Sequence, residues 1–157
     1  MKSEVASIIQ RIERTLYGDP WYGKAILSIL DEVDGRLAHV QKSGSPHSLL
    51  AILYHMNAWA TFTLKSIRKE PFNHAKQGED GDWPLLNVKT YTWKKELSNY
   101  KKLHKEIVTE LQKLDDSFLV EMVAERKYNF RFLLNGLLEH NIYHAGQIAL
   151  LSKLSAA

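Results

Sequence analysis

Hydrophobic residues recur at the spacing of α-helices along almost the whole chain. In the first segment they fall at helical intervals up to Leu16, and Gly18-Asp19-Pro20 is then typical of a turn. A second stripe begins after Pro20 and comprises Ile26, Ile29, Leu30, Val33, Leu37 and Val40. These patterns predict a short N-terminal helix followed by a longer second helix.

Two further amphipathic segments follow, separated by an irregular stretch. Ser45 and Pro46 are typical of a helix start, and the apolar positions after them continue to about Arg68. Over residues 70–90 proline and glycine interrupt the pattern, as in a long crossover connection. From Trp93 the apolar positions resume at alternating steps of four and three until Asp115-Asp116-Ser117 interrupts them, which predicts a fourth helix.

The last predicted helix begins after Asn129, which can cap it, and extends to about Leu154. It is apolar on most sides, so we expect it to be the most buried element. No segment has the strict alternation of a sheet strand. We therefore predict a single all-α domain over residues 1–157, a four-helix bundle with an additional short N-terminal helix and a long crossover connection at residues 70–90.

Composition narrows the chemistry that such a bundle can perform. The 157 residues include seven histidines and no cysteine, which excludes disulfides, thiolate-bound zinc, iron–sulfur clusters and a thiol nucleophile within the chain. The net charge of +3 comes from interspersed basic and acidic residues, so we expect no nucleic-acid partner. No apolar run approaches the length of a membrane span, and the N-terminal segment lacks the apolar core of a signal peptide. We expect a cytoplasmic protein with no membrane association.

The pair His140 and His144 is the most distinctive chemical feature. Residues four apart on a helix lie one turn from each other, with Cβ atoms about 5–6 Å apart, so both imidazoles could reach one ion. Both share a face with Leu137 and Ile148, and inward-facing imidazoles must find partners. A shared cation is one solution, and hydrogen bonds to neighbouring groups are the other.

Two histidines on other predicted helices could extend this pair. His55 lies beside the apolar face of the third helix and is the candidate third ligand, although alone it would be interpreted as a core-edge histidine bonded to a carbonyl. His104, on the seam of the fourth helix, could be a fourth ligand or a base, but a hydrogen-bonded core histidine is favoured. The remaining histidines are expected at the surface: His39, His47 and His74.

The residues around the pair do not match the zinc-protease motif. Asn141 stands where the HExxH motif of zinc proteases has its general base, and Glu139 is about 100° away around the helix, where solvent is expected. Tyr143 also points away from the pair, and we expect it to serve in packing. Three tryptophans are predicted to be core or pocket wall: Trp59, Trp83 and Trp93.

Three blocks of sequence together resemble a known family. The first block runs from Pro46-His47-Ser48 into Leu53-Tyr54-His55-Met56-Asn57-Ala58-Trp59. The second is Gly81-Asp82-Trp83-Pro84, and the third and most specific is Gly136-Leu137-Leu138-Glu139-His140-Asn141-Ile142-Tyr143-His144-Ala145-Gly146-Gln147-Ile148. In this order they resemble the DinB-like (YfiT-like) family of four-helix-bundle, metal-dependent hydrolases and thiol transferases. The resemblance implies that His55, His140 and His144 bind one divalent metal ion and leave positions open for water or substrate. Asn141 departs from the aspartate that the family often has there.

The same resemblance implies the chemistry. A zinc or nickel ion held by three histidines would activate water, or a low-molecular-weight thiol such as bacillithiol, for hydrolysis or S-transfer. Since the chain has no cysteine, such a thiol must arrive as a substrate. The alternative is a noncatalytic, metal-stabilised bundle that acts as a stress-related interaction protein. A small-molecule or thiol substrate is the expected partner, and a homodimer is compatible with a small bundle although no face for it is indicated.

Overall fold

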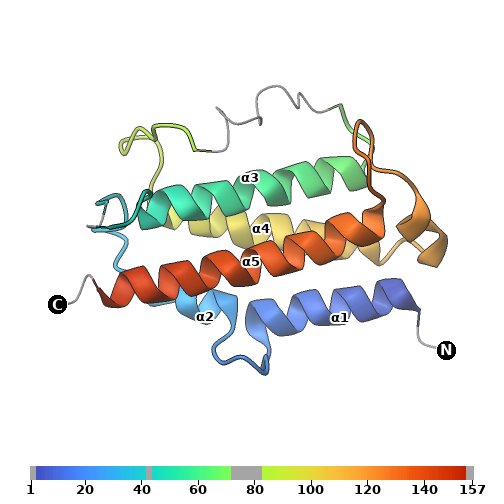
Figure 1. Ribbon diagram of the computed structural model, residues 1–157, viewed down its shortest axis with the longest axis horizontal. Helices are drawn as coiled ribbons and strands as arrows, with labels where there is room; N and C mark the ends of the chain where they lie inside the picture. The colour runs from blue at the N-terminus through green and yellow to red at the C-terminus, as the bar shows by residue number, and fades with distance from the viewer. Residues whose placement is uncertain (1–2, 42–43, 72–82, 155–157) are drawn as a thin grey trace.

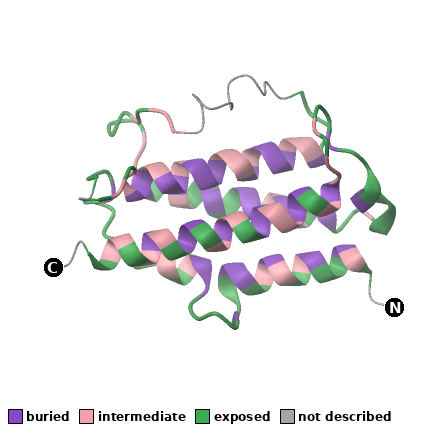
Figure 2. Cartoon of the chain, in the orientation of Figure 1, coloured by how far each residue is buried: buried purple, intermediate pink, exposed green. Residues whose placement is uncertain are grey.

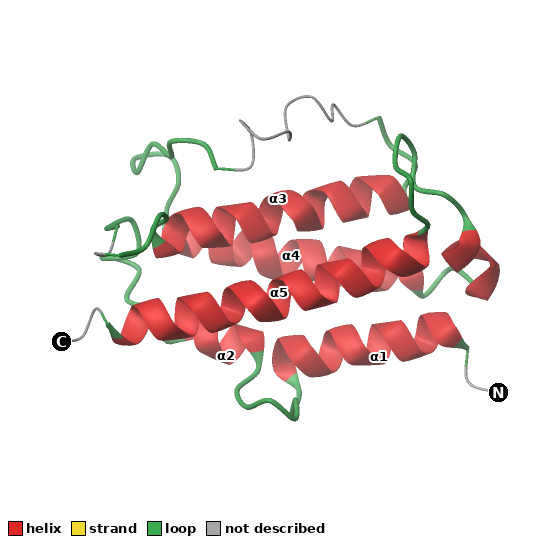
Figure 3. Ribbon diagram, viewed as in Figure 1, coloured by secondary structure: helices red, strands yellow, loops and turns green. Residues whose placement is uncertain are grey.

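Five α-helices and one 3-10 helix make up the protein in a computed structural model that describes residues 3–41, 44–71 and 83–154 (Figure 1). The helices are α1 (Glu4–Tyr17), α2 (Ile26–Asp31), α3 (Leu49–Ile67), α4 (Trp93–Leu111), the 3-10 helix η2 (Asp116–Val120) and α5 (Phe130–Lys153). Within the described ranges there is no strand, only an isolated bridge between Met122 and Asn129 (Figure 3). The predicted all-α bundle is confirmed.

The first position of the bundle is shared by two helices. Helices α1 and α2 follow one another alongside α5, and both contact it (Figure 1). The prediction of a long second helix reaching Val40 is wrong, because α2 has six residues and ends at Asp31. Single turns replace it, each closed three residues back, such as Leu37 N–H to Asp34 O at 3.1 Å. Turns of this kind repeat apolar residues almost as a helix does, which explains the error.

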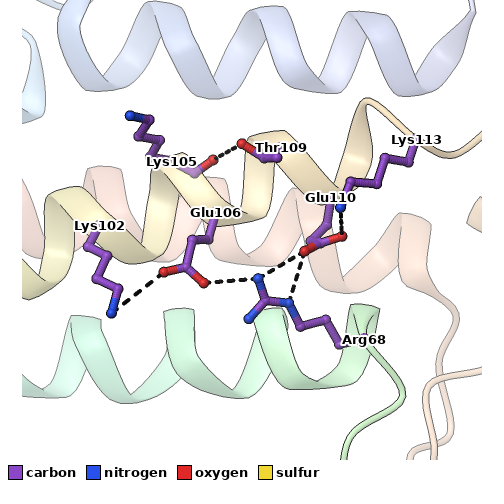
Figure 4. Close-up of polar contacts among 7 residues, drawn as sticks. All are labelled: Arg68, Lys102, Lys105, Glu106, Thr109, Glu110 and Lys113. Atoms are coloured by element: carbon purple, nitrogen blue, oxygen red, sulfur yellow. Dashed lines mark hydrogen bonds and ion pairs between the residues drawn. The ribbon is translucent and has the colours of Figure 1, made fainter.

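Helices α3 and α4 run parallel. Near their starts, the Asn57 carboxamide donates to the carbonyl and carboxylate of Glu96. Near their ends, Arg68 pairs with Glu106 and Glu110, both at 2.9 Å (Figure 4). Each helix has 19 residues, so the chain between them must return about 28 Å along the bundle. This requirement agrees with the predicted crossover at 70–90, of which 72–82 lie outside the described residues.

Helix α5 packs antiparallel to α3. The expectation that it is the most buried element is wrong, because nine of its 24 residues are buried against 12 of 19 in α3 (Figure 2). The Asn129 side chain caps it by accepting the Phe132 N–H, as predicted. The expected start of α3 at Ser45 is wrong. Ser48 provides that cap through the Ala51 N–H, whereas the Ser45 hydroxyl bonds the His47 carbonyl in the preceding turn.

None of the described helices is both long and apolar enough to span a membrane.

Candidate metal centre

Three histidines meet between α3 and α5. His55 belongs to α3, and His140 and His144 lie one turn apart on α5. The Nε2 atoms of His55 and His140 are 2.9 Å apart, and one potential ligand atom from each of the three rings lies within 4.8 Å of the other two. The ring centroids of each pair are 4.4 to 4.9 Å apart. The structure therefore brings together the three histidines that the sequence singled out, and we call them the histidine cluster.

The packing of the two helices explains this convergence. Because α3 and α5 are antiparallel neighbours, inward positions on each face the other across the bundle. His55 and His144 are each 6% exposed, and His140 is half-buried. The cluster is thus held by core packing on both helices, with His140 as its most accessible member.

Gln147 fixes the orientation of one ring. The Nδ1–H of His144 donates to the Gln147 carboxamide oxygen at 2.6 Å, and the amide nitrogen of Gln147 donates to the Tyr143 hydroxyl at 3.2 Å. With its proton on Nδ1, His144 has a free lone pair on Nε2 for a ligand. Tyr143 itself is 64% exposed, so the expectation that it serves in packing is wrong.

An indole covers the cluster on one side. Trp83, in the segment that precedes α4, stacks on His55 with a centroid distance of 4.2 Å and an interplanar angle of 12°. Its other neighbour is His47, at 3.5 Å and 8°. Trp83 is therefore a wall of the site, as predicted. His47, expected at the surface, is half-buried beside it. Stacking between two loops and a helix leaves no periodic signal, so sequence reasoning missed the role of His47.

Burial favours the neutral form of two imidazoles of the cluster, His140 and His144. Burial, together with the nearby His144 and His55 rings, lowers the pKa of His140 to about 3, against an opposing effect of Asn141. Burial also lowers the pKa of His144, partly offset by its hydrogen bond to Gln147. Metal ligation requires neutral imidazole, so the environment favours the ligand form of these rings.

The donor set fits a divalent metal ion. Imidazole nitrogens bind zinc at about 2.0–2.1 Å, which places two ligands of one ion about 2.9 to 3.3 Å apart for right-angled to tetrahedral geometry. The 2.9 Å between the Nε2 atoms of His55 and His140 lies at the lower limit of this range, and all three ligand atoms lie within 4.8 Å of one another. The Nδ1 atom of His140 is buried without a hydrogen-bond partner, whereas Nε2 faces His55, so Nε2 is the atom that this ring would offer to a cation.

His104 lies apart from the cluster. Its Nδ1–H donates to the Tyr100 carbonyl at 2.9 Å, and its Nε2 accepts from the Asn141 carboxamide at 2.8 Å. This is the hydrogen-bonded core histidine that the sequence favoured. Asn141 therefore faces α4, and no metal role follows from its position. Glu139 and His39 are exposed, as expected, whereas His74 lies outside the described residues.

The other tryptophans occupy different environments. Trp93 is buried in the core, and its indole N–H donates to the Leu30 carbonyl at 3.2 Å. Trp59 is half-buried, and its ring lies 6.0 Å from that of His140. Trp59 therefore flanks the cluster, and Trp93 anchors α4 to α2.

One comparison with known proteins gives a match. The family model described as the DinB superfamily matches residues 23–148, a range that contains all three members of the histidine cluster. No curated protein and no solved structure matches the chain.

Proposed function

The chain belongs to the DinB superfamily, and from this membership and the histidine cluster we propose that His55, His140 and His144 bind one divalent metal ion. The observation that carries the proposal is the approach of three ligand atoms from two helices to within 4.8 Å of one another. A divalent metal bound there lowers the pKa of a coordinated water or thiol and so supplies a nucleophile near neutral pH. We propose that the protein uses this nucleophile for hydrolysis or for S-transfer.

Residues of the chain prepare the site for such chemistry. Gln147 holds the His144 ring with Nε2 free, and Trp83 covers His55 and excludes water from that side. Three protein ligands are typical of catalytic metal sites, in which a further position remains for water or substrate. His140 is the most accessible ligand, so substrate approaches from its side of the cluster.

Zinc and nickel are the metals that we propose. Imidazole ligands suit both, and copper and iron as well, so elemental analysis must identify the ion. A thiol used in S-transfer is a substrate, since the chain has no cysteine of its own.

A second candidate is a noncatalytic bundle that the metal stabilises. It is favoured by the position of the cluster across the α3–α5 contact, where an ion would link two core helices. An ion that binds only the folded state raises its stability by mass action. Under this alternative, metal raises the melting temperature and no substrate is turned over.

Metal content tests the assignment of the ligands. We expect one metal equivalent in protein purified without a histidine tag, and its loss from each of His55→Ala, His140→Ala and His144→Ala. His39→Ala is the matched control, because it removes an exposed histidine outside the cluster and should retain the metal. Circular dichroism establishes that each variant is helical. Full metal content in all three cluster variants would overturn the proposal.

Turnover separates the two candidate functions. Metal-loaded and chelator-stripped protein are compared on ester and amide substrates, and on an electrophile offered together with a low-molecular-weight thiol. Activity that is lost on stripping and returns with zinc or nickel supports the enzyme. A metal-dependent rise in melting temperature without activity on either panel supports the noncatalytic bundle.

A further inference from the structure

A recess of about 280 Å³ lies between α3 and α5 on the accessible side of the histidine cluster. His140 forms part of its wall, so the recess and the cluster share a residue. Most of the remaining wall is aromatic or aliphatic: Trp59, Tyr128, Phe132, Leu133 and Leu137. We call this feature the aromatic recess.

The chemistry of the wall selects for an apolar occupant. None of the described residues that line the aromatic recess is a lysine, arginine, aspartate or glutamate. The Thr63 hydroxyl donates to the Trp59 carbonyl of its own helix at 2.9 Å, so its hydrogen is not available to an occupant. Ligand pockets typically combine such apolar walls with a few polar groups at one end. Here the polar end is His140.

A larger cavity, of about 860 Å³, lies on another side of α5 and differs from the aromatic recess in the charge of its wall and in having no cluster histidine in that wall. It is lined by several charged residues, among them Lys24, Glu32 and Asp34, and by none of the three cluster histidines. An occupant of that cavity would not share a wall with the proposed metal ligands. Three further cavities of the described residues are likewise lined by none of the cluster histidines.

We infer that the aromatic recess binds an uncharged aromatic ring of the substrate, whose polar reacting group then lies at the metal. This inference rests on the proposed function. The volume of the aromatic recess is just below the usual range for ligand pockets, which suits a single ring rather than an extended molecule. Rings of Trp59, Tyr128 and Phe132 would offer that ring stacked and edge contacts.

Two glycines of α5 provide matched variants. A Cβ built on Gly136, which lines the aromatic recess, meets nothing within 4 Å, and the same is true of Gly146, which lines the larger cavity. Leucine is a better helix former than glycine, so neither substitution should weaken α5. Gly136→Leu fills the aromatic recess, and Gly146→Leu places the same side chain in the other cavity.

The probes are benzohydroxamate and acetohydroxamate, which carry the same metal-binding group with and without a ring. Calorimetry on zinc-loaded protein should show benzohydroxamate binding at least about tenfold more tightly, the expected gain for burying a phenyl ring. Gly136→Leu should abolish this preference and leave acetohydroxamate affinity unchanged, and Gly146→Leu should retain it. Phe132→Ala, a change at a 65% exposed position, should reduce the preference by removing part of the wall.

The outcomes distinguish the inference from the proposed function. Equal affinities of the two hydroxamates for the zinc-loaded wild type overturn the aromatic recess as a ring site and leave the metal site standing. A preference lost in Gly146→Leu and kept in Gly136→Leu also overturns it and assigns the ring to the larger cavity. A wild-type protein that takes up neither zinc nor nickel refutes the proposed function, and the inference with it.

Discussion

His104 should lower the stability of the protein in acid, and replacing it should remove this part of the pH dependence. The ring is 2% exposed, and its two nitrogens are committed to the Tyr100 carbonyl and the Asn141 carboxamide. Since Nε2 accepts a hydrogen bond, the added proton of an imidazolium has no acceptor in this arrangement. Burial lowers the pKa of His104 to about 4, against an opposing effect of the hydrogen bond to Tyr100.

The magnitude follows from proton linkage. The pKa of a histidine in the unfolded chain is about 6.5. Between pH 6.5 and 4 the unfolded chain therefore binds a proton at His104, whereas the folded protein keeps this ring neutral. The contribution of neutral His104 to the free energy of unfolding is therefore fully present above pH 6.5, and it is lost as the pH falls from 6.5 to 4. At pH 4 the loss due to His104 alone is about 3 kcal/mol.

The test compares His104→Gln with wild type in urea unfolding at pH 7, 6, 5 and 4, followed by circular dichroism. A chelator is present, so that no metal complicates the comparison. Glutamine can keep part of the hydrogen bonding, and we expect the variant to be about 1 kcal/mol less stable at pH 7. It lacks the titrating ring and should be about 2 kcal/mol more stable than wild type at pH 4.

Crossing stability curves are thus the expected signature. Lys105→Gln, one residue further along α4, keeps all seven histidines and should follow the pH dependence of wild type. Parallel curves for His104→Gln and wild type between pH 7 and 4 would refute the reasoning, because they would mean that His104 carries no linked proton.

Three other substitutions have defined outcomes. Gly136→Ala should raise the free energy of unfolding by about 1 kcal/mol, since the added Cβ meets nothing within 4 Å; a decrease in urea unfolding would contradict this. Asn141→Leu leaves the buried Nε2 of His104 without a donor and should cost about 1–3 kcal/mol in the same assay; unchanged stability would speak against the network. Trp83→Ala uncovers His55 and should weaken zinc binding roughly tenfold in chelator competition, whereas equal affinity would show that the stacked indole does not support the site.

Capping and turn residues predicted the ends of helices correctly where the nearby sequence alone determines them. Asn129 caps α5, and Gly18 closes α1, because side-chain and turn chemistry at a helix end is written in neighbouring residues. The errors arose where two local solutions compete. Ser45 and Ser48 can each cap a helix, and only the turn around His47 selects Ser48 for α3.

The candidate site likewise contains residues that helical spacing predicts and residues that it does not. The pair His140 and His144 follows from helical spacing, and the apolar stripe of α3 directs His55 inward, so these three positions were accessible from the sequence. Trp83 and His47 are brought together by segments outside the helices, for which no periodicity exists. The hydrogen bond between Gln147 and His144 depends on side-chain rotamers, which the spacing of residues does not determine.

Asn141 follows His140 of the histidine cluster along α5 and contacts His104 of α4. The sequence placed it beside a metal ligand, where an aspartate would have suggested a role in orienting or activating His140. In the structure its amide nitrogen faces α4 and holds neutral His104, and its carbonyl oxygen is buried without a partner. A carboxylate in this core would need a proton or a cation to offset its burial, and the nearest imidazole would be drawn towards its charged form. A neutral carboxamide avoids that cost, and the hydrogen bond that it donates to Nε2 favours the neutral form of His104.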